Sequence, residues 1–145
     1  MGTLAELSLP VDQDTVTHAL AWLETIGQQA HWPSRTLFKL SLCLDETLTN
    51  VTMYGYARAA PNAVEPQVKL QLREEDQRLV LRIMDNGVAF DPTRQTPREL
   101  DISLDDARIG GHGLRLMQHY LEDIRYERRN GWNQLELIAV VDDAS

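Results

Sequence analysis

The chain has 145 residues, 43% of them hydrophobic and 25% charged, and a net charge of −8. These values are typical of one soluble globular domain, so we expect residues 1–145 to form a single domain. The acidic balance argues against direct nucleic-acid binding, which normally needs a basic face. No apolar run approaches the roughly 18 residues that span a bilayer, so we expect no membrane partner.

The sequence lacks the features of a secreted protein. Residues 1–10 have neither the basic start nor the apolar core of a signal peptide. Cys43 is the one cysteine, so no internal disulfide can form. Its place in an apolar pattern predicts a small, buried side chain. We therefore expect a cytoplasmic protein.

The first half of the chain reads as a strand followed by two helices. Residues 3–9 alternate between apolar and polar. Two later runs carry apolar side chains at helical spacing: one is capped by Asp12 or Asp14 and ends near residue 30, and the other extends from 35 to about 54. On the second helix Glu46 and Asn50 are four residues apart, so they share a face, which points away from the leucine stripe. Polar residues are common on such outer faces, so the pair alone does not identify a site.

The second half contains two predicted hairpins. Residues 68–72 and 79–84 alternate on either side of a polar turn at 74–77, and the second run leads into the turn sequence Asp85-Asn86-Gly87. Residues 124–127 and 135–140 are joined around Asn130-Gly131, a strong hairpin signal. Between the hairpins, residues 91–109 show no strong periodicity, and segments this long without regular structure tend to be lids or disordered.

A glycine-rich run, Gly110 to Leu114, precedes a predicted amphipathic helix that continues to about residue 122. Three of the eight glycines fall within four residues. Backbone N–H groups at a helix start, together with the positive end of the helix dipole, can bind a phosphate group. Glycines before a helix more often form a tight turn, so the run alone does not establish phosphate binding.

Taken in order, three segments resemble the motifs of the GHKL ATP-binding superfamily. They read DETLTNVTMYGY at 45–56, IMDNGVAFDP at 83–92 and RIGGHGLRLM at 108–117. Their wording is similar to the anti-sigma-factor serine/threonine kinases of bacterial partner-switching systems. The resemblance implies an α+β fold, a two-layer α/β sandwich of the Bergerat type with a mixed, mainly antiparallel sheet and helices on one face. ATP would lie between helices and sheet, beneath a mobile lid at 91–109.

The resemblance also implies the residues that carry the chemistry. Glu46 resembles the catalytic carboxylate that accepts the proton of the substrate hydroxyl. Asn50 resembles the residue whose side-chain oxygen binds Mg²⁺, with the metal bridging the phosphates of ATP. Phosphoryl transfer needs a positioned nucleophile and neutralised phosphate charge, so these groups suit that reaction.

Further residues would bind the nucleotide. Asp85 resembles the aspartate that accepts a hydrogen bond from the exocyclic amine of adenine, and Gly87 would let the backbone pass close to the base. Gly111 and Gly113 would leave backbone N–H groups open to the phosphates, at the start of the helix that carries Leu114.

The chain departs from the pattern of related proteins in three places. Ala89 stands where histidine kinases have another glycine, which weakens any assignment as a sensor kinase. Tyr54 replaces the histidine that many of these kinases carry before a Gly-Tyr pair. Asn133 and Gln134 stand where a threonine is often found near the adenine, and Asn133 is the candidate replacement.

The resemblance implies a kinase that phosphorylates a serine or threonine of a small anti-sigma-antagonist (STAS) protein. A sigma factor or another regulator would be the second partner, and the kinase would form a homodimer. The alternative is an ATP-binding module that sequesters a partner without significant turnover; Glu46 favours the enzyme. The ATP-binding half of a histidine kinase is a third reading, but none of the four histidines has the context of a phosphoacceptor.

Overall fold

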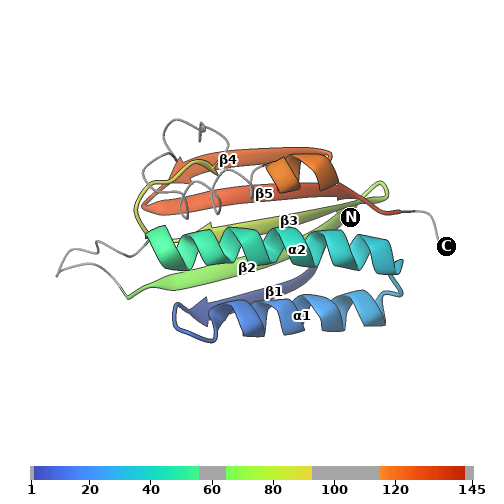
Figure 1. Ribbon diagram of the computed structural model, residues 1–145, viewed down its shortest axis with the longest axis horizontal. Helices are drawn as coiled ribbons and strands as arrows, with labels where there is room; N and C mark the ends of the chain where they lie inside the picture. The colour runs from blue at the N-terminus through green and yellow to red at the C-terminus, as the bar shows by residue number, and fades with distance from the viewer. Residues whose placement is uncertain (1, 56–64, 93–114, 143–145) are drawn as a thin grey trace.

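A computed structural model of the chain describes residues 2–55, 65–92 and 115–142 (Figure 1). Five strands form one sheet in the order β1-β2-β3-β5-β4. The strands are β1 (Gly2–Pro10), β2 (Gln67–Glu75), β3 (Arg78–Asp85), β4 (Asp123–Arg129) and β5 (Trp132–Val140). Between β1 and β2 lie α1 (Thr15–Gln29), α2 (Ser34–Asn50) and a five-residue π-helix, η1 (Val51–Gly55), and a further short helix spans residues 115–120.

The sheet is antiparallel at each of its four pairings in the described part of the chain. The α+β class and the two-layer arrangement predicted from the sequence are confirmed. The parallel pairing that a mixed sheet requires does not occur among the described strands. Both predicted hairpins, β2–β3 and β4–β5, are present.

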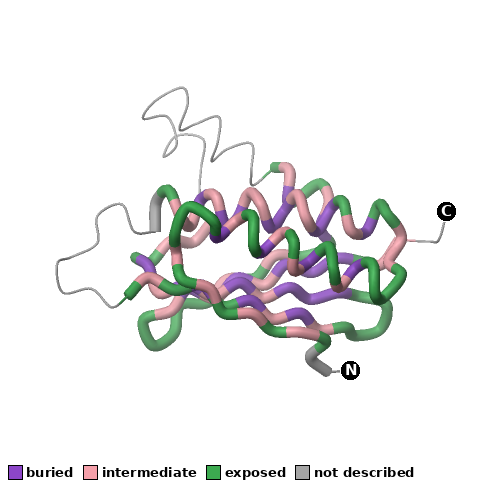
Figure 2. The backbone as a smooth tube through the Cα atoms, turned by 90° about the horizontal axis from the view of Figure 1, so that it is seen from below, coloured by how far each residue is buried: buried purple, intermediate pink, exposed green. Residues whose placement is uncertain are grey.

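The helices cover one face of the sheet (Figure 2). Strand residues at every second position point toward them, which is why Val68, Leu70 and Leu72 of β2 are almost fully buried. Leu40, Leu44 and Leu48 of α2 form the facing stripe and are fully buried. Cys43 lies in the same core, as its apolar setting predicted.

Two boundaries differ from the sequence prediction for a physical reason. The turn expected at 74–77 is only Asp76-Gln77, because Glu74 and Glu75 continue β2 at its exposed end. The second helix does not remain α-helical to residue 54; it changes to π-helix at Val51, directly after Asn50. Short π segments are often found at functional sites, and this one begins beside a predicted site residue.

Candidate functional site: a cavity between α2 and the sheet

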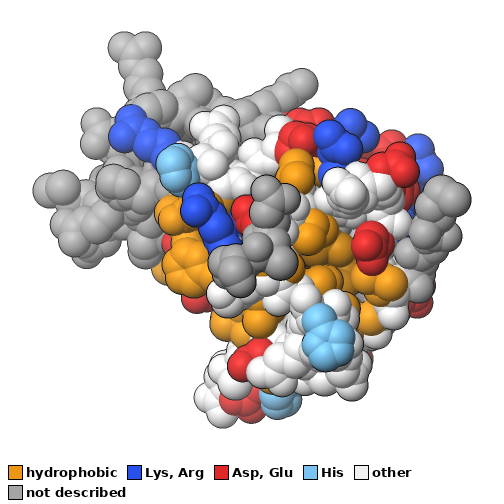
Figure 3. Space-filling model, turned by 90° about the vertical axis from the view of Figure 1, so that its right-hand side faces the viewer, with side chains coloured by type: hydrophobic (Ala, Val, Ile, Leu, Met, Phe, Trp, Pro, Cys, Tyr) orange, Lys and Arg blue, Asp and Glu red, His pale blue; other side chains and the backbone are white. Residues whose placement is uncertain are grey.

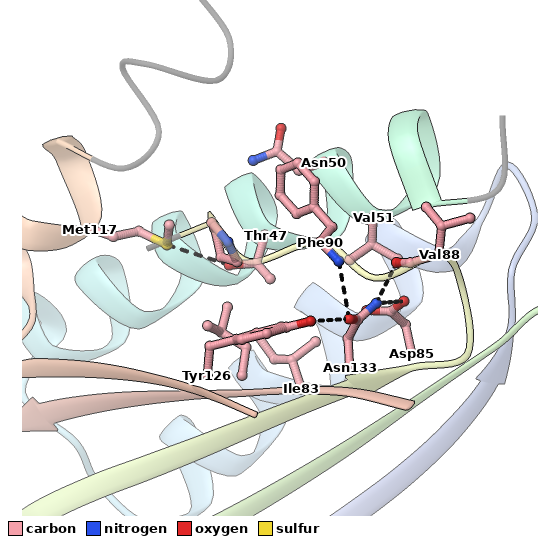
Figure 4. Close-up of a pocket in the computed structure, with 12 residues that line it drawn as sticks. Thr47, Asn50, Val51, Ile83, Asp85, Val88, Phe90, Met117, Tyr126 and Asn133 are labelled. Atoms are coloured by element: carbon pink, nitrogen blue, oxygen red, sulfur yellow. Dashed lines mark hydrogen bonds between the residues drawn. The ribbon is translucent and has the colours of Figure 1, made fainter. Parts of the chain in front are cut away.

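A cavity lies between α2 and the ends of β3, β4 and β5 (Figure 4). Most of its wall is apolar, and a few polar side chains stand in that wall. The lining residues are Thr47, Asn50, Val51, Ile83, Asp85, Val88, Phe90, Pro92, Met117, Tyr126, Asn133 and Leu135.

Asp85 is the last residue of β3, and its carboxylate is 5% exposed. Its Oδ1 accepts hydrogen bonds from the Gly87 backbone N–H (3.0 Å) and from Asn133 Nδ2 (2.9 Å). Burial raises the pKa of Asp85, while these hydrogen bonds and the nearby charge of Arg128 oppose the rise. No described residue donates to Oδ2, so that oxygen can accept a hydrogen bond from a ligand.

Asn133 on β5 is the centre of the polar network around Asp85. It is 4% exposed and pairs with Asp85 in the β3–β5 ladder. Its Nδ2 donates to Asp85 Oδ1 and to the Val88 carbonyl (2.8 Å), and its Oδ1 accepts from the Tyr126 hydroxyl and the Phe90 N–H (3.2 Å). All four hydrogen-bonding positions of the amide are therefore used within the protein.

The segment after β3 is held in place by the neighbouring strands. Arg128 of β4 donates to the Gly87 carbonyl (2.7 Å), and Asn133 holds Val88 and Phe90 as described. Gly87 itself is buried, and Val88 is 48% exposed at the rim. This wall of the cavity is therefore fixed before any ligand binds, which lowers the ordering cost of binding.

The helix side of the cavity presents polar groups with weak or absent partners. Asn50, the last residue of α2, is 8% exposed, and its Oδ1 is buried without a hydrogen-bond partner among the described residues. Thr47 is 6% exposed, and within the described part of the chain it donates only to the sulfur of Met117 (3.5 Å), which is a weak acceptor. Buried polar groups usually have good partners, so this edge of the cavity suits a polar ligand.

Two of the predicted site residues, Asn50 and Asp85, line the cavity from opposite layers. The expectation that Asn50 lies on an outer helix face is wrong, because the cavity wall buries it. Glu46 lies one helical turn before Asn50, is half-buried and has a buried Oε2 atom, but it is not a lining residue. Gly87 lies beside Asp85, within hydrogen-bonding distance of it.

The remaining predicted positions lie outside the described residues. They are Gly111, Gly113 and Leu114, together with Gly110 and residues 93–109 of the expected lid. Their predicted roles stay predictions.

The sequence interpretation underestimated Asn133 and did not single out Tyr126 or Thr47. The signal for Asn133 was its place opposite Asp85 in adjacent strands, which depends on the strand register. Tyr126 and Thr47 carry no motif, and only the fold brings them to the cavity.

The described residues contain no group of three or more His, Cys, Asp or Glu side chains able to hold a metal ion. None of their helices is long and apolar enough to cross a membrane.

Residues 9–139 match the histidine kinase-like ATPase domain, and the chain belongs to this family. The family resemblance predicted from the three motifs is thereby confirmed.

Relatives within this family cover most of the chain. The serine/threonine-protein kinase BtrW of Bordetella bronchiseptica is 44% identical over 131 residues, which are 90% of this chain and 89% of BtrW. The serine-protein kinase RsbW of Listeria innocua is 24% identical over 123 residues, covering 82% and 76% of the two chains.

The fold has a solved counterpart. The crystal structure of the RsbU and RsbW domains of a Mycobacterium tuberculosis protein matches 97% of this chain with a TM-score of 0.65 at 12% sequence identity. This chain spans 34% of that longer chain. At this identity the likeness concerns the fold alone.

Proposed function

We propose that this protein, a serine/threonine kinase of the GHKL type, transfers the γ-phosphate of ATP to a serine or threonine of a small anti-sigma-antagonist protein with a STAS domain. Phosphorylation would decide which partner the kinase holds, and the second partner would be a sigma factor or another regulator. The relatives named serine or serine/threonine kinases support the reaction type. The STAS substrate and the partner switch come from the motif resemblance.

The observation that carries the proposal is the pairing of two layers around one cavity. The sheet supplies Asp85, whose Oδ2 can accept from the exocyclic amine of adenine, and α2 supplies Asn50, whose Oδ1 lacks a partner among the described residues. The adenine ring would lie toward Asp85, and the phosphates would lie toward the end of α2. Glu46, one turn before Asn50, would then be near the transferred phosphate and accept the proton of the substrate hydroxyl.

The residues present fit a magnesium ion. Mg²⁺ is usually held by one or two protein oxygens together with substrate phosphates, rather than by a cage of side chains. The buried Oδ1 of Asn50 is such an oxygen, and the described residues offer no competing acidic cluster. When bound, the ion would neutralise phosphate charge. Asn50 would hold it at the carboxyl end of α2.

Other features of the proposal follow the family resemblance. The protein would act as a homodimer in the cytoplasm, with protein partners and no nucleic acid. The net charge of −8 is compatible with protein partners and unfavourable for direct DNA binding.

The alternative function is sequestration of a partner by an ATP-bound module without turnover. Glu46 discriminates the two, because a module that only binds ATP needs no general base. The test is incubation with labelled ATP, Mg²⁺ and the antagonist encoded beside this protein, if there is one. We expect label on a serine or threonine of the antagonist; a tight complex without label would favour sequestration.

The Glu46→Gln variant sharpens the test. We expect it to bind ATP with little change in affinity and to lose phosphoryl transfer by about 100-fold or more, the loss typical of removing a general base. Asp45→Asn is the matched control, because it removes the neighbouring carboxylate of α2, which accepts from Thr49. If Glu46→Gln transfers the phosphate as fast as the wild type, Glu46 is not the general base.

A further inference from the structure

We propose that Thr47 is a nucleotide-binding residue, and that its hydroxyl donates a hydrogen bond to a ring nitrogen of the bound purine. This inference rests on the proposed function, since it assumes that the base of ATP occupies the cavity. It adds a polar contact from α2 to the one that Asp85 makes from the sheet.

The first reason is the hydrogen bonding of Thr47 in the absence of ligand. Its side chain points into the cavity and is 6% exposed, and its hydroxyl contacts the Met117 sulfur at 3.5 Å (Figure 4). It makes no other hydrogen bond with the described residues. A thioether is a weak acceptor, so the hydroxyl can exchange this contact for a better one at little cost.

The second reason is the contrast with Asn133, another small polar residue of the wall. The amide of Asn133 is fully used by four protein groups and so has no capacity left for a ligand. Thr47 keeps its capacity and faces a wall that is mostly apolar, with side chains such as Val51, Ile83 and Leu135. A nearly unused hydroxyl in an apolar wall can orient a ligand, as the few polar groups of small-molecule sites do.

The third reason is position. Thr47 is three residues before Asn50 on α2, so the two side chains lie on neighbouring turns of the same helix face. Both line the cavity opposite the strand that ends at Asp85. If the phosphates lie toward Asn50 and the exocyclic amine toward Asp85, the purine ring lies between them, beside Thr47.

The experiment compares Thr47→Val and Thr47→Ser with the wild type by calorimetric titration with ATP in the presence of Mg²⁺ and without any protein substrate. Valine keeps the shape of threonine and removes the hydroxyl, whereas serine keeps the hydroxyl and removes the methyl group. We expect Thr47→Val to weaken ATP binding about 3- to 10-fold, which corresponds to one neutral hydrogen bond. We expect Thr47→Ser to weaken it by less.

Deaza analogues of ATP identify the contacted atom. For one of 1-deaza-, 3-deaza- and 7-deaza-ATP, the Thr47→Val penalty should vanish, because the acceptor nitrogen is missing in that ligand. The penalty should persist with the other two. An equal penalty with all three would overturn the contact to a ring nitrogen.

Stability measurements separate this role from a structural one. Because the hydroxyl has only a sulfur partner among the described residues, Thr47→Val should unfold at the same or a higher urea concentration than the wild type. Unchanged ATP affinity in Thr47→Val, or an equal loss in Thr47→Ser, would overturn the inference while the proposed function stands. A wild-type protein that binds no ATP would overturn both.

Discussion

The buried carboxylate of Asp85 is costly to the free protein. It is 5% exposed, and burial raises its pKa although Asn133, Gly87 and Arg128 oppose the change. A carboxylic acid whose pKa is higher in the folded than in the unfolded state favours folding less once it ionises. At neutral pH the charge of Asp85 therefore lowers the free energy of unfolding.

We predict that Asp85→Asn gains stability and loses ATP affinity. The amide can keep an oxygen at the position of Oδ1 for Asn133 and Gly87, while its NH₂ replaces Oδ2. It no longer offers an acceptor to the exocyclic amine, so ATP binding should weaken about 10- to 100-fold, as for a hydrogen bond to a charged group. Its gain in stability should grow as pH rises from 3.8 through the raised pKa of Asp85.

Urea unfolding between pH 3 and 7, with ATP titration at pH 7, tests both parts. Asp76→Asn is the control, because it makes the same chemical change at an exposed turn position. It should leave ATP affinity unchanged. If Asp85→Asn binds ATP as well as the wild type, Asp85 does not accept a hydrogen bond from adenine.

At the scale of elements, the two hairpins show what local sequence determines. Asn130 and Gly131 have φ values of 53° and 82°, the pair of positive values that a type I′ turn requires. Asp76 and Gln77 have φ values of 49° and 63° and form the same two-residue turn between β2 and β3. The turn at Asn130-Gly131 was predictable from its Asn-Gly sequence. Gln77 gives no such signal, and a glutamine in this left-handed conformation destabilises the folded state.

We predict that Gln77→Gly stabilises the protein by about 0.5–1 kcal/mol and that Gly131→Ala destabilises it by about 1–2 kcal/mol. An added Cβ at Gly131 would meet nothing within 4 Å, so the loss there measures backbone strain alone. The bond from the Val141 N–H to the Gln77 carbonyl is a backbone contact and should remain. The measurement is urea unfolding of each variant, in which a shifted midpoint with an unchanged m-value reports a change in stability.

The control for this turn is Gln71→Gly. It makes the same change within β2, where the backbone is extended, and should destabilise by about 0.5–1 kcal/mol. A loss of stability in Gln77→Gly as large as that in Gln71→Gly would show that positive φ is not what strains the turn.

The approach of α1 to α2 depends on Gly27. A Cβ at this position would lie 2.9 Å from both Leu37 Cδ1 and Trp32 Cε3, closer than carbon atoms pack. We predict that Gly27→Ala destabilises the protein by about 1–2 kcal/mol, because the overpacking exceeds the gain in helix propensity. Thermal melts of the purified variants test this prediction. Thr25→Ala, at an exposed position of α1, is the control and should lose no stability. A Gly27→Ala variant as stable as the wild type would mean that these side chains move aside freely.

The elements were largely predictable from periodicity, and the site only in part. The motifs indicated Asn50 and Asp85, which line the cavity, and Glu46, whose role stays a prediction. Periodicity placed Asn50 on an outer face, because helical spacing cannot show that the cavity wall buries it. The four hydrogen bonds of Asn133 depend on the register of three strands and on the path of the segment after β3. The change from α- to π-helix at Val51 likewise has no local signal that we recognise.

At the scale of the whole molecule, the end of β5 is tied to the start of α2. This end of the molecule faces the viewer in Figure 3. Lys39, 6% exposed, donates to the Val140 carbonyl (2.7 Å) and pairs with Asp142 Oδ2 (2.8 Å). Thr36 Oγ1 donates to the same Oδ2 (2.7 Å) and accepts from the Asp142 N–H (2.9 Å). The contact joins segments about a hundred residues apart and closes the helical layer onto the sheet.

Asp142 responds to pH in the opposite sense to Asp85. Burial alone would raise the pKa of Asp142, but the hydrogen bonds from Lys39 and Thr36 and the charges of Lys39 and Arg35 outweigh it, and the pKa is lowered. The ionised carboxylate therefore stabilises the fold above pH 3.8, and this contribution is lost as pH falls through the lowered value.

We predict that Asp142→Asn destabilises the protein by about 1–3 kcal/mol at pH 7, because Lys39 keeps its charge in a buried position without a counterion. Relative to the wild type, Asp142→Asn should lose stability as pH rises through the acidic range, whereas Asp85→Asn should gain it. Asp123→Asn is the control, because its pair with Arg125 is exposed and should contribute less than 1 kcal/mol. If the stabilities of Asp142→Asn and Asp85→Asn changed with pH in the same direction, the opposite pKa shifts of Asp142 and Asp85 would be contradicted. Opposite profiles would show that acid weakens the closure of the layers while it relieves the charge in the cavity.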